Sequence, residues 1–245
     1  MKTLPDLAYG PEPWMLFDLY LPDGAPRGTF LWFHGGGLEN GTRKDILFAE
    51  DLAAAGFAVA SATYRLYPGA HFPEFIEDAA DAAAYLHAQG PHLGAGGPLY
   101  VAGQSAGAYL AMMLALDRSR LARRGLAPED FAGFVADSAQ LTAHFRVLVE
   151  RGLDGRLERI DEAAPFFFLG AENVPPPLLL IHYADDIPCR PEQNRLFARN
   201  LKVLHPDADL VQVELPGTHT AGSVGRDPDG AFAFVRTFLA WVANR

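Results

Sequence analysis

Cysteine and long apolar runs are scarce in this sequence. The chain of 245 residues has a single cysteine, Cys189, so it can form neither an internal disulfide nor a cluster of metal-binding thiolates. No apolar run approaches the roughly 18 residues that a membrane-spanning helix needs. Residues 1–15 carry prolines and acidic residues where a signal peptide would have its apolar segment. We therefore expect a cytoplasmic protein that does not insert into a membrane.

Positive charge is also scarce. The chain has 20 Lys and Arg residues against 30 Asp and Glu residues, a formal net charge of −10. Proteins that bind nucleic acids need a basic surface, so this balance argues against a nucleic-acid partner. Apolar residues make up 49% of the chain, enough for the core of one large domain. We expect residues 1–245 to form a single domain that acts on a small molecule. The oligomeric state stays open, a homo-oligomer included.

Short apolar runs alternate with longer amphipathic runs along most of the chain. The strand-like runs are 14–21, 29–33, 57–63, 98–102, 131–136, 178–183 and 209–214. The helix-like runs are 44–55, 74–88, 106–117, 191–202 and 229–242. This alternation predicts an α/β fold with a mostly parallel sheet of about 7–8 strands and helices on both faces. The turn signal Pro22-Asp23-Gly24 suggests that the first two strands are antiparallel partners.

In open parallel sheets the ligand site lies at the carboxyl ends of the strands, so catalytic residues should directly follow strands. Residues 103–107, Gly-Gln-Ser-Ala-Gly, stand between the strand 98–102 and the helix 106–117. A G-x-S-x-G sequence in that context predicts a nucleophile elbow, a tight turn that exposes the central serine. Ser105 is therefore the candidate nucleophile. A glycine turn with an incidental serine is the alternative, and a phosphate-binding loop is disfavoured because its lysine is missing.

A second glycine-rich segment follows the strand 29–33. Residues 34–37 read His-Gly-Gly-Gly. Glycines allow backbone N–H groups to approach a tetrahedral oxyanion closely, and the N–H of Ala106 would add a further donor. We expect His34 to hold this loop in place rather than to act as a base.

A serine nucleophile needs a histidine to take its proton. In this type of fold the order along the chain is serine, acid, histidine. His219 follows the strand 209–214, whereas His205 precedes that strand and should lie at the opposite edge of the sheet. His219 is therefore the candidate base.

The histidine in turn needs a carboxylate to orient it. Asp185 and Asp186 both follow the strand 178–183, and spacing alone does not separate them. Asp137, which follows the strand 131–136, is a third candidate.

Several stretches together resemble the α/β-hydrolase superfamily in its esterase branch, which includes hormone-sensitive-lipase-like enzymes, carboxylesterases and kynurenine formamidase. They are FDLYLP (17–22), HGGG (34–37), the segment 64–86, GQSAG (103–107), PPPLLLIHYADD (175–186) and GTH (217–219). The resemblance covers nearly the whole chain. It implies the α/β-hydrolase fold and a serine mechanism that needs neither a metal nor an organic cofactor.

The resemblance also assigns residues. Its pattern of strand, His-Gly, two residues and aspartate implies Asp186 as the triad acid, with Asp185 second. Tyr183 stands where the pattern has glycine. The oxyanion donors that it implies are the backbone N–H groups of Gly36, Gly37 and Ala106.

Only about 15 residues precede the first expected strand, and the insertion at 138–174 is modest, so we expect a minimal cap. Phenylalanines in that insertion, Phe166–Phe168 among them, are interpreted mainly as core. We expect a carboxylesterase-type hydrolase that cleaves small to medium esters through an acyl-enzyme. The alternatives are an amide or formamide hydrolase of the kynurenine formamidase type and a non-catalytic binding protein with this fold.

Overall fold

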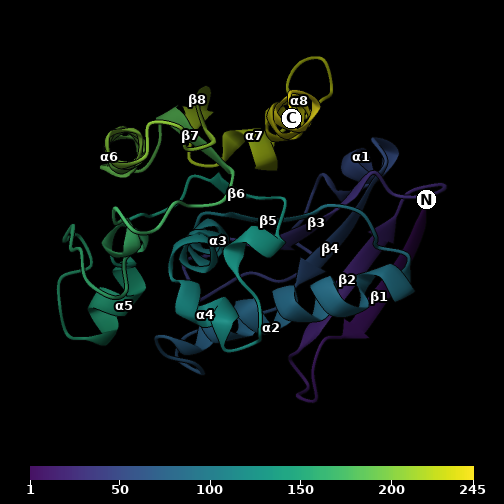
Figure 1. The fold of residues 1–245 in the computed structure, drawn as a ribbon, viewed down its shortest axis with the longest axis horizontal. Helices are drawn as coiled ribbons and strands as arrows, with labels where there is room; N and C mark the ends of the chain where they lie inside the picture. The colour runs from purple at the N-terminus through teal and green to yellow at the C-terminus, as the bar shows by residue number, and fades with distance from the viewer.

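The computed structural model describes all 245 residues and contains an eight-stranded sheet in the order β1-β2-β4-β3-β5-β6-β7-β8 (Figure 1). The strands are β1 (Lys2–Ala8), β2 (Leu16–Leu21), β3 (Gly28–Phe33), β4 (Phe57–Ala62), β5 (Leu99–Gln104), β6 (Gly133–Asp137), β7 (Leu178–Asp185) and β8 (Leu210–Thr218). All neighbours from β4 across to β8 are parallel, and β2 is antiparallel to both β1 and β4. The mostly parallel sheet predicted from the sequence is confirmed.

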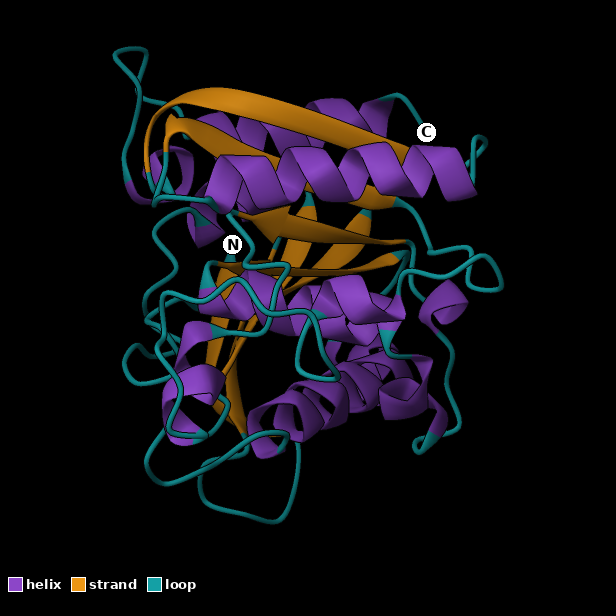
Figure 2. Cartoon of the chain, turned by 90° about the vertical axis from the view of Figure 1, so that its left-hand side faces the viewer, coloured by secondary structure: helices purple, strands orange, loops and turns teal.

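Helices cover both faces of this sheet, also as predicted (Figure 2). They are α1 (Ala49–Ala54), α2 (Glu74–Gln89), α3 (Ala106–Leu116), α4 (Arg118–Ala122), α5 (Phe145–Glu150), α6 (Arg190–Leu204), α7 (Ala221–Val224) and α8 (Ala233–Ala243). Helices α2, α3 and α6 contribute to the core on one face, and α1 and α8 to the core on the other. None of the helices has the length and apolar character needed to cross a bilayer.

The two cores explain why β3 is apolar at almost every position. Side chains alternate between the faces of a strand, and both faces are covered here. Leu31 and Phe33 therefore pack against the α2 and α3 side. Phe30 and Trp32 pack against the other side, where the ring of Phe30 lies 4.8 Å from that of Phe238 in α8.

Two expectations about the first strands are wrong. β3 is not the partner of β2, because β4 lies between them and pairs with β2 through Phe17 and Ala62. β3 instead lies between β4 and β5, further from the edge of the sheet, and all of its residues are buried. The first strand is β1, which begins at Lys2. It was missed because it is mostly exposed, polar and interrupted by Pro5, features that an edge strand tolerates.

The expected helix 44–55 is shorter than predicted. Residues 44–48 form turns, and α1 begins at Ala49. The Asp45 carboxylate accepts a hydrogen bond from the Thr42 backbone N–H at 2.7 Å. Short polar side chains that bond the local backbone in this way favour turns over helix.

The connection between β6 and β7 forms the minimal cap that was expected. It contains α5 and a short 3-10 helix, Pro165–Phe168. Phe166 and Phe168 pack against the main core, and the ring of Phe166 lies 5.5 Å from that of Phe197 in α6. Phe167 is exposed. Two of the three phenylalanines are therefore partly buried and pack on the core, in broad agreement with the interpretation from the sequence.

Candidate active site

Ser105 occupies a strained turn between β5 and α3. Its backbone has φ 52° and ψ −110°, a region that side-chain-bearing residues rarely adopt and that costs roughly 1–3 kcal/mol. Two glycines make the turn feasible. A Cβ at Gly103 would lie 2.2 Å from the backbone of Gly107, and a Cβ at Gly107 would lie 2.0 Å from the carbonyl oxygen of Phe33. The turn therefore holds the Ser105 side chain at the carboxyl edge of the sheet.

His219 and Asp186 complete a hydrogen-bonded chain with this serine. His219 directly follows β8, and its Nε2 lies 2.9 Å from Oγ of Ser105. Its Nδ1 lies 2.5 Å from Oδ1 of Asp186, which directly follows β7. A carboxylate can only accept, so Nδ1 carries the proton and Nε2 is free to accept the hydroxyl proton of Ser105. The structure thus brings together the three residues expected to form a triad.

The environment of Asp186 keeps it ionised. Burial opposes ionisation, but hydrogen bonds from His219 and Ser138, the charge of His219 and the N–H of Ile187 lower the pKa of its carboxyl below the ordinary value. The side chain of Asp186 is fully buried, whereas the neighbouring Asp185 is exposed and has no hydrogen bond to His219. Of the two adjacent aspartates, only Asp186 contacts the histidine.

The other candidate histidines lie elsewhere. His205 follows α6, and its Nε2 bonds the carbonyl oxygen of Gly170 at 2.8 Å. His34 is buried, stacks on Tyr64 with ring centroids 4.4 Å apart, and bonds the Gly35 carbonyl oxygen through Nδ1 at 2.7 Å. Burial lowers the pKa of His34, so the ring is neutral at pH 7. It fixes the glycine loop, as expected.

The loop that carries two of the three expected oxyanion donors lies beside the serine, because a Cβ at Gly35 would lie 3.5 Å from Cβ of Ser105. Gly36 and Gly37 have positive φ values of 107° and 67°, and a Cβ at Gly36 would lie 2.1 Å from the carbonyl oxygen of Asn40. Ala106 is the first residue of α3, where backbone N–H groups have no partner within the helix. None of these three N–H groups donates a hydrogen bond to another protein group. They are available to a negatively charged ligand atom beside Ser105.

Two further side chains line the oxyanion loop. The ring of Phe145 in α5 would lie 2.9 Å from a Cβ at Gly37, so it packs directly against the loop. Arg146 forms an ion pair with Glu39, and its guanidinium lies 5.0 Å from the ring centroid of Tyr67. An aromatic ring and a charge-neutralised arginine therefore border the site.

Ser138 is a residue of this site that sequence reasoning missed. It follows β6 directly and has a φ of 61°. Its Oγ donates to Oδ2 of Asp186 and lies 2.9 Å from Nδ1 of His219. Arg190, a buried residue, holds the Ser138 carbonyl oxygen through Nη1 at 2.7 Å. Its position directly after a strand is the one signal in the sequence that could have indicated Ser138, and the preceding residue, Asp137, has the same signal.

That preceding residue, Asp137, does not contact His219. It is fully buried and bonds Tyr183 and Ser223 instead. The structure therefore places the rival acid beside the triad and not in it. No group of three or more His, Cys, Asp or Glu side chains could hold a metal ion.

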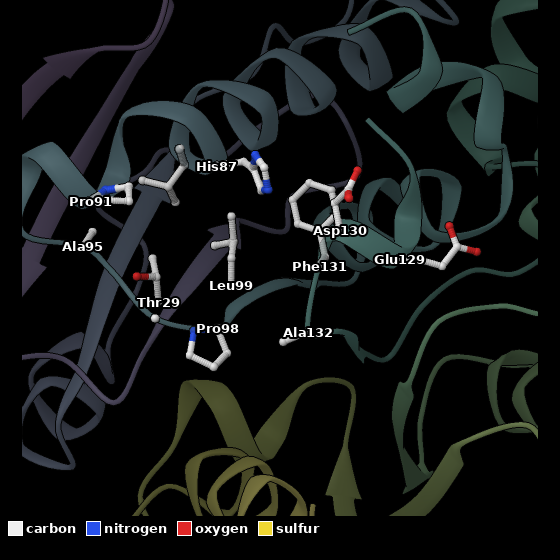
Figure 3. A pocket seen from close by; sticks show the side chains of 12 residues that line it. Thr29, His87, Pro91, Ala95, Pro98, Leu99, Glu129, Asp130, Phe131 and Ala132 are labelled. Atoms are coloured by element: carbon white, nitrogen blue, oxygen red, sulfur yellow. The ribbon is translucent and has the colours of Figure 1, made fainter. Parts of the chain in front are cut away.

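A cavity of about 360 Å³ lies away from these residues (Figure 3). Thr29 and Leu99, which line it, stand at the starts of β3 and β5, whereas Ser105 follows the end of β5. His87 and Phe131 also border it. Because β3 and β5 begin at this cavity and Ser105 follows the end of β5, the cavity and the triad lie at opposite ends of the strands.

The sheet order, the Ser105 turn and the residues that follow β7 and β8 define an α/β-hydrolase. Residues 17–127 match the family model described as BD-FAE. Solved structures agree on the fold: a crystal structure of esterase B from Lactobacillus Rhamnosis (HN001) has a TM-score of 0.80 at 19% identity, and covers 99% of this chain and 85% of that one.

Two curated relatives come from Mycobacterium tuberculosis (strain ATCC 25618 / H37Rv). Esterase LipC is 26% identical over 234 residues, which are 85% of this chain and 57% of the relative. Esterase LipI is 37% identical over 97 residues, 38% of this chain and 30% of the relative. The matched part thus spans about a third to just over half of these relatives. The chain thus has the α/β-hydrolase fold, and the two curated relatives are named esterases, in agreement with the resemblance.

Proposed function

We propose that this protein is a serine hydrolase of the carboxylesterase type that cleaves small to medium carboxylic esters through an acyl-enzyme. The observation that carries the proposal is the continuous hydrogen-bonded chain from Ser105 through His219 to Asp186, with distances of 2.9 and 2.5 Å. In the proposed roles, Ser105 is the nucleophile, His219 the general base and Asp186 the residue that orients and stabilises the imidazolium.

The first half of the reaction forms the acyl-enzyme. Oγ of Ser105 attacks the ester carbonyl carbon while its proton passes to Nε2 of His219. The carbonyl oxygen becomes an oxyanion, which the N–H groups of Gly36, Gly37 and Ala106 stabilise, and this electrostatic contribution is usually a large part of catalysis. The tetrahedral intermediate then expels the alkoxide, which receives the proton from His219 and leaves as the alcohol.

The second half releases the acid. His219 takes a proton from a water molecule, whose oxygen attacks the acyl carbonyl carbon. The second tetrahedral intermediate breaks its bond to Oγ of Ser105, and His219 returns the proton to that oxygen. The enzyme is regenerated, and the product is the carboxylic acid.

Two features support an ester of limited size. The curated relatives LipC and LipI are named esterases. The connection between β6 and β7 carries only the short helices α5 and Pro165–Phe168, and the ring of Phe145 packs against the oxyanion loop, where it would limit the space beside the acyl group. Cytoplasmic location and single-domain organisation stay predictions from the sequence, and the oligomeric state stays open.

The direct test replaces Ser105 with alanine and measures hydrolysis of p-nitrophenyl acetate and butyrate. We expect kcat to fall by roughly 10⁴-fold or more, because triad residues act as a unit. Ser119→Ala is the matched control, since Ser119 is an exposed serine whose Oγ bonds only Asp117. A fluorophosphonate probe should label the wild type and the control but not Ser105→Ala. Full turnover by Ser105→Ala would refute the proposal.

The same machinery could cleave an amide or formamide, so the substrate is tested separately. A panel of acetyl to octanoyl esters, a feruloyl ester and N-formylkynurenine ranks the classes by kcat/KM. We expect the short esters to be the best substrates. A preference for N-formylkynurenine would replace the ester proposal by the formamidase alternative. Absence of both turnover and probe labelling would favour a binding protein.

A further inference from the structure

Asp137 is a buried carboxyl group with no role in the mechanism above. It is the last residue of β6 and is completely shielded from solvent. Its two oxygens have different partners: Oδ1 accepts a hydrogen bond from the Tyr183 hydroxyl at 2.8 Å, and Oδ2 accepts one from Oγ of Ser223. A buried carboxyl is costly unless it is fully hydrogen-bonded, so this arrangement calls for an explanation.

The partners of Asp137 belong to the segments that carry the triad. Tyr183 lies in β7, three residues before Asp186. Its hydroxyl oxygen accepts the backbone N–H of Gly222 at 3.1 Å, and Gly222 lies in α7, just after His219. Tyr183 therefore ties the acid-bearing strand to the histidine-bearing segment.

The nucleophile turn joins the same network. The side-chain amide of Gln104, the residue before Ser105, donates to Oγ of Ser223 at 2.9 Å. The backbone N–H of Ser105 donates to the carbonyl oxygen of Asp137 at 2.7 Å. Asp137 and its partner Ser223 thus connect the segments of all three triad residues.

The segment that carries His219 has little stability of its own. Thr220 has a positive φ of 59°, and α7 contains only four residues, too few for an independently stable helix. Ser223 anchors this segment: its N–H bonds the Thr220 carbonyl oxygen at 3.0 Å, and its Oγ bonds the Asp137 carboxyl. The position of His219 depends on contacts of this kind.

We propose that Asp137 is a positioning residue, whose ionised carboxylate holds the His219 segment in register with Ser105 through Ser223 and Tyr183. The inference rests on the proposed serine-hydrolase function. It also accounts for Tyr183, which departs from the glycine of the family pattern. The tyrosine hydroxyl reaches Asp137, and a Cβ at Gly222 would lie 2.9 Å from that hydroxyl, so the tyrosine and the glycine fit each other.

Two O–H donors converge on the carboxyl, and only the ionised form accepts from both. A protonated carboxyl would itself donate to one of these oxygens, and Oγ of Ser223 would then donate to the Thr220 carbonyl oxygen, 3.1 Å away, instead of to Asp137. Burial raises the pKa of Asp137 to about 7, the hydrogen bonds from Ser223 and Tyr183 lower it, and the charge of Asp186 raises it. Burial also raises the pKa of Tyr183, so its hydroxyl remains a donor.

The groups around Asp137 define its pH response. β7 and the residue after it contribute the titratable groups Tyr183 and Asp186, while β5 and α7 contribute the uncharged Gln104 and Ser223. Acidification near neutrality should therefore protonate Asp137. We expect the acid limb of kcat/KM in the wild type to include the proton that Asp137 binds.

The experiment compares Asp137→Asn and Tyr183→Phe with the wild type. Tyr9→Phe is the matched control, because Tyr9 is also buried and its hydroxyl donates to one carbonyl oxygen, that of Thr63, after the edge strand β1. Each protein is titrated with a fluorophosphonate to count competent sites, and kcat, KM and the pH profile are measured with p-nitrophenyl butyrate.

For Asp137→Asn we expect kcat per titrated site to fall by roughly 10- to 100-fold, with KM little changed, because the histidine is misplaced. Its acid limb should lack the proton of Asp137 and should therefore be less steep than that of the wild type. Tyr183→Phe removes a hydrogen bond that lowers the pKa of Asp137, so its acid limb should move to higher pH. Tyr9→Phe should match the wild type. If Asp137→Asn does not fold, the shift in Tyr183→Phe carries the test.

The inference is overturned if Asp137→Asn retains the wild-type kcat per titrated site, since the residue would then serve folding alone. An unchanged acid limb in Tyr183→Phe also overturns it. Failure of the proposed function gives a different result: the wild type itself shows no ester turnover and no labelling of Ser105.

Discussion

Oγ of Ser138 lies beside the pair formed by Asp186 and His219, donating to the carboxylate of the first and standing 2.9 Å from Nδ1 of the second. Ser138 and His219 thus meet at the same aspartate. The serine hydroxyl supplies one of the hydrogen bonds that lower the pKa of Asp186 and so favours its charged form. The charge of Asp186 stabilises the imidazolium that the proposed mechanism forms at His219.

Ser138→Ala should therefore slow catalysis without abolishing it. A hydrogen bond to a charged group contributes about 1.5–3 kcal/mol, which corresponds to roughly 10- to 150-fold in rate. Only the part that is stronger in the transition state affects kcat, so we expect kcat for p-nitrophenyl butyrate to fall by about 10-fold, near the lower end of that range. The triad hydrogen bonds remain, and KM should change little. Ser119→Ala serves as the control. Wild-type kcat in Ser138→Ala would mean that this hydrogen bond does not assist the reaction.

The two adjacent aspartates should behave very differently. Asp186→Asn removes the carboxylate that selects the His219 tautomer, and such a change lowers kcat by roughly 10⁴-fold in serine triads. Asp185→Asn changes an exposed side chain of the same type one residue away and should leave kcat near the wild-type value. Steady-state kinetics on both variants checks this. A large loss in Asp185→Asn with a small one in Asp186→Asn would reverse the proposed assignment.

The glycines of the Ser105 turn should be required for folding as well as for activity. In Gly107→Ala the new methyl group would lie 2.0 Å from the Phe33 carbonyl oxygen, a rigid backbone atom. We expect a loss of at least about 3 kcal/mol in unfolding free energy or failure to fold, because overpacking against backbone cannot relax. Gly96→Ala is the control, since a Cβ there meets nothing within 4 Å. Equal melting temperatures for the two variants would contradict the expectation.

The sequence predicted most of the sheet and much of the site because the relevant signals are local. The alternation of strands and helices, the glycines around Ser105 and the position of His219 after a strand are all readable from short windows. β1 was not predicted because this edge strand is mostly exposed and lacks an apolar pattern. The Asp137 network was not predicted for another reason. Its members Gln104, Tyr183 and Ser223 are far apart in the chain, and only the fold brings them together.

The unfolding free energy of the protein should depend on pH through Asp137. Its pKa rises from the ordinary 3.8 to about 7 on folding, so the folded state binds a proton more tightly than the unfolded state. The stabilisation is complete below about pH 4 and is lost as the pH rises through about 7. Because one pKa unit corresponds to about 1.36 kcal/mol, the rise from 3.8 to about 7 limits this stabilisation to about 4 kcal/mol at most. Asp137→Asn has no such group, so the difference in unfolding free energy, wild type minus variant, should decrease with pH.

Urea unfolding of both proteins between about pH 5.5 and pH 8.5 measures that difference, which should drop by about 2 kcal/mol and then level off above about pH 8. Asp186 has the opposite tendency, since its lowered pKa stabilises the fold at high pH and that contribution is lost on acidification. It is present in both proteins and cancels in the comparison. A difference that stays constant with pH would mean that Asp137 is ionised throughout this range, and that its carboxylate is held without cost to the fold.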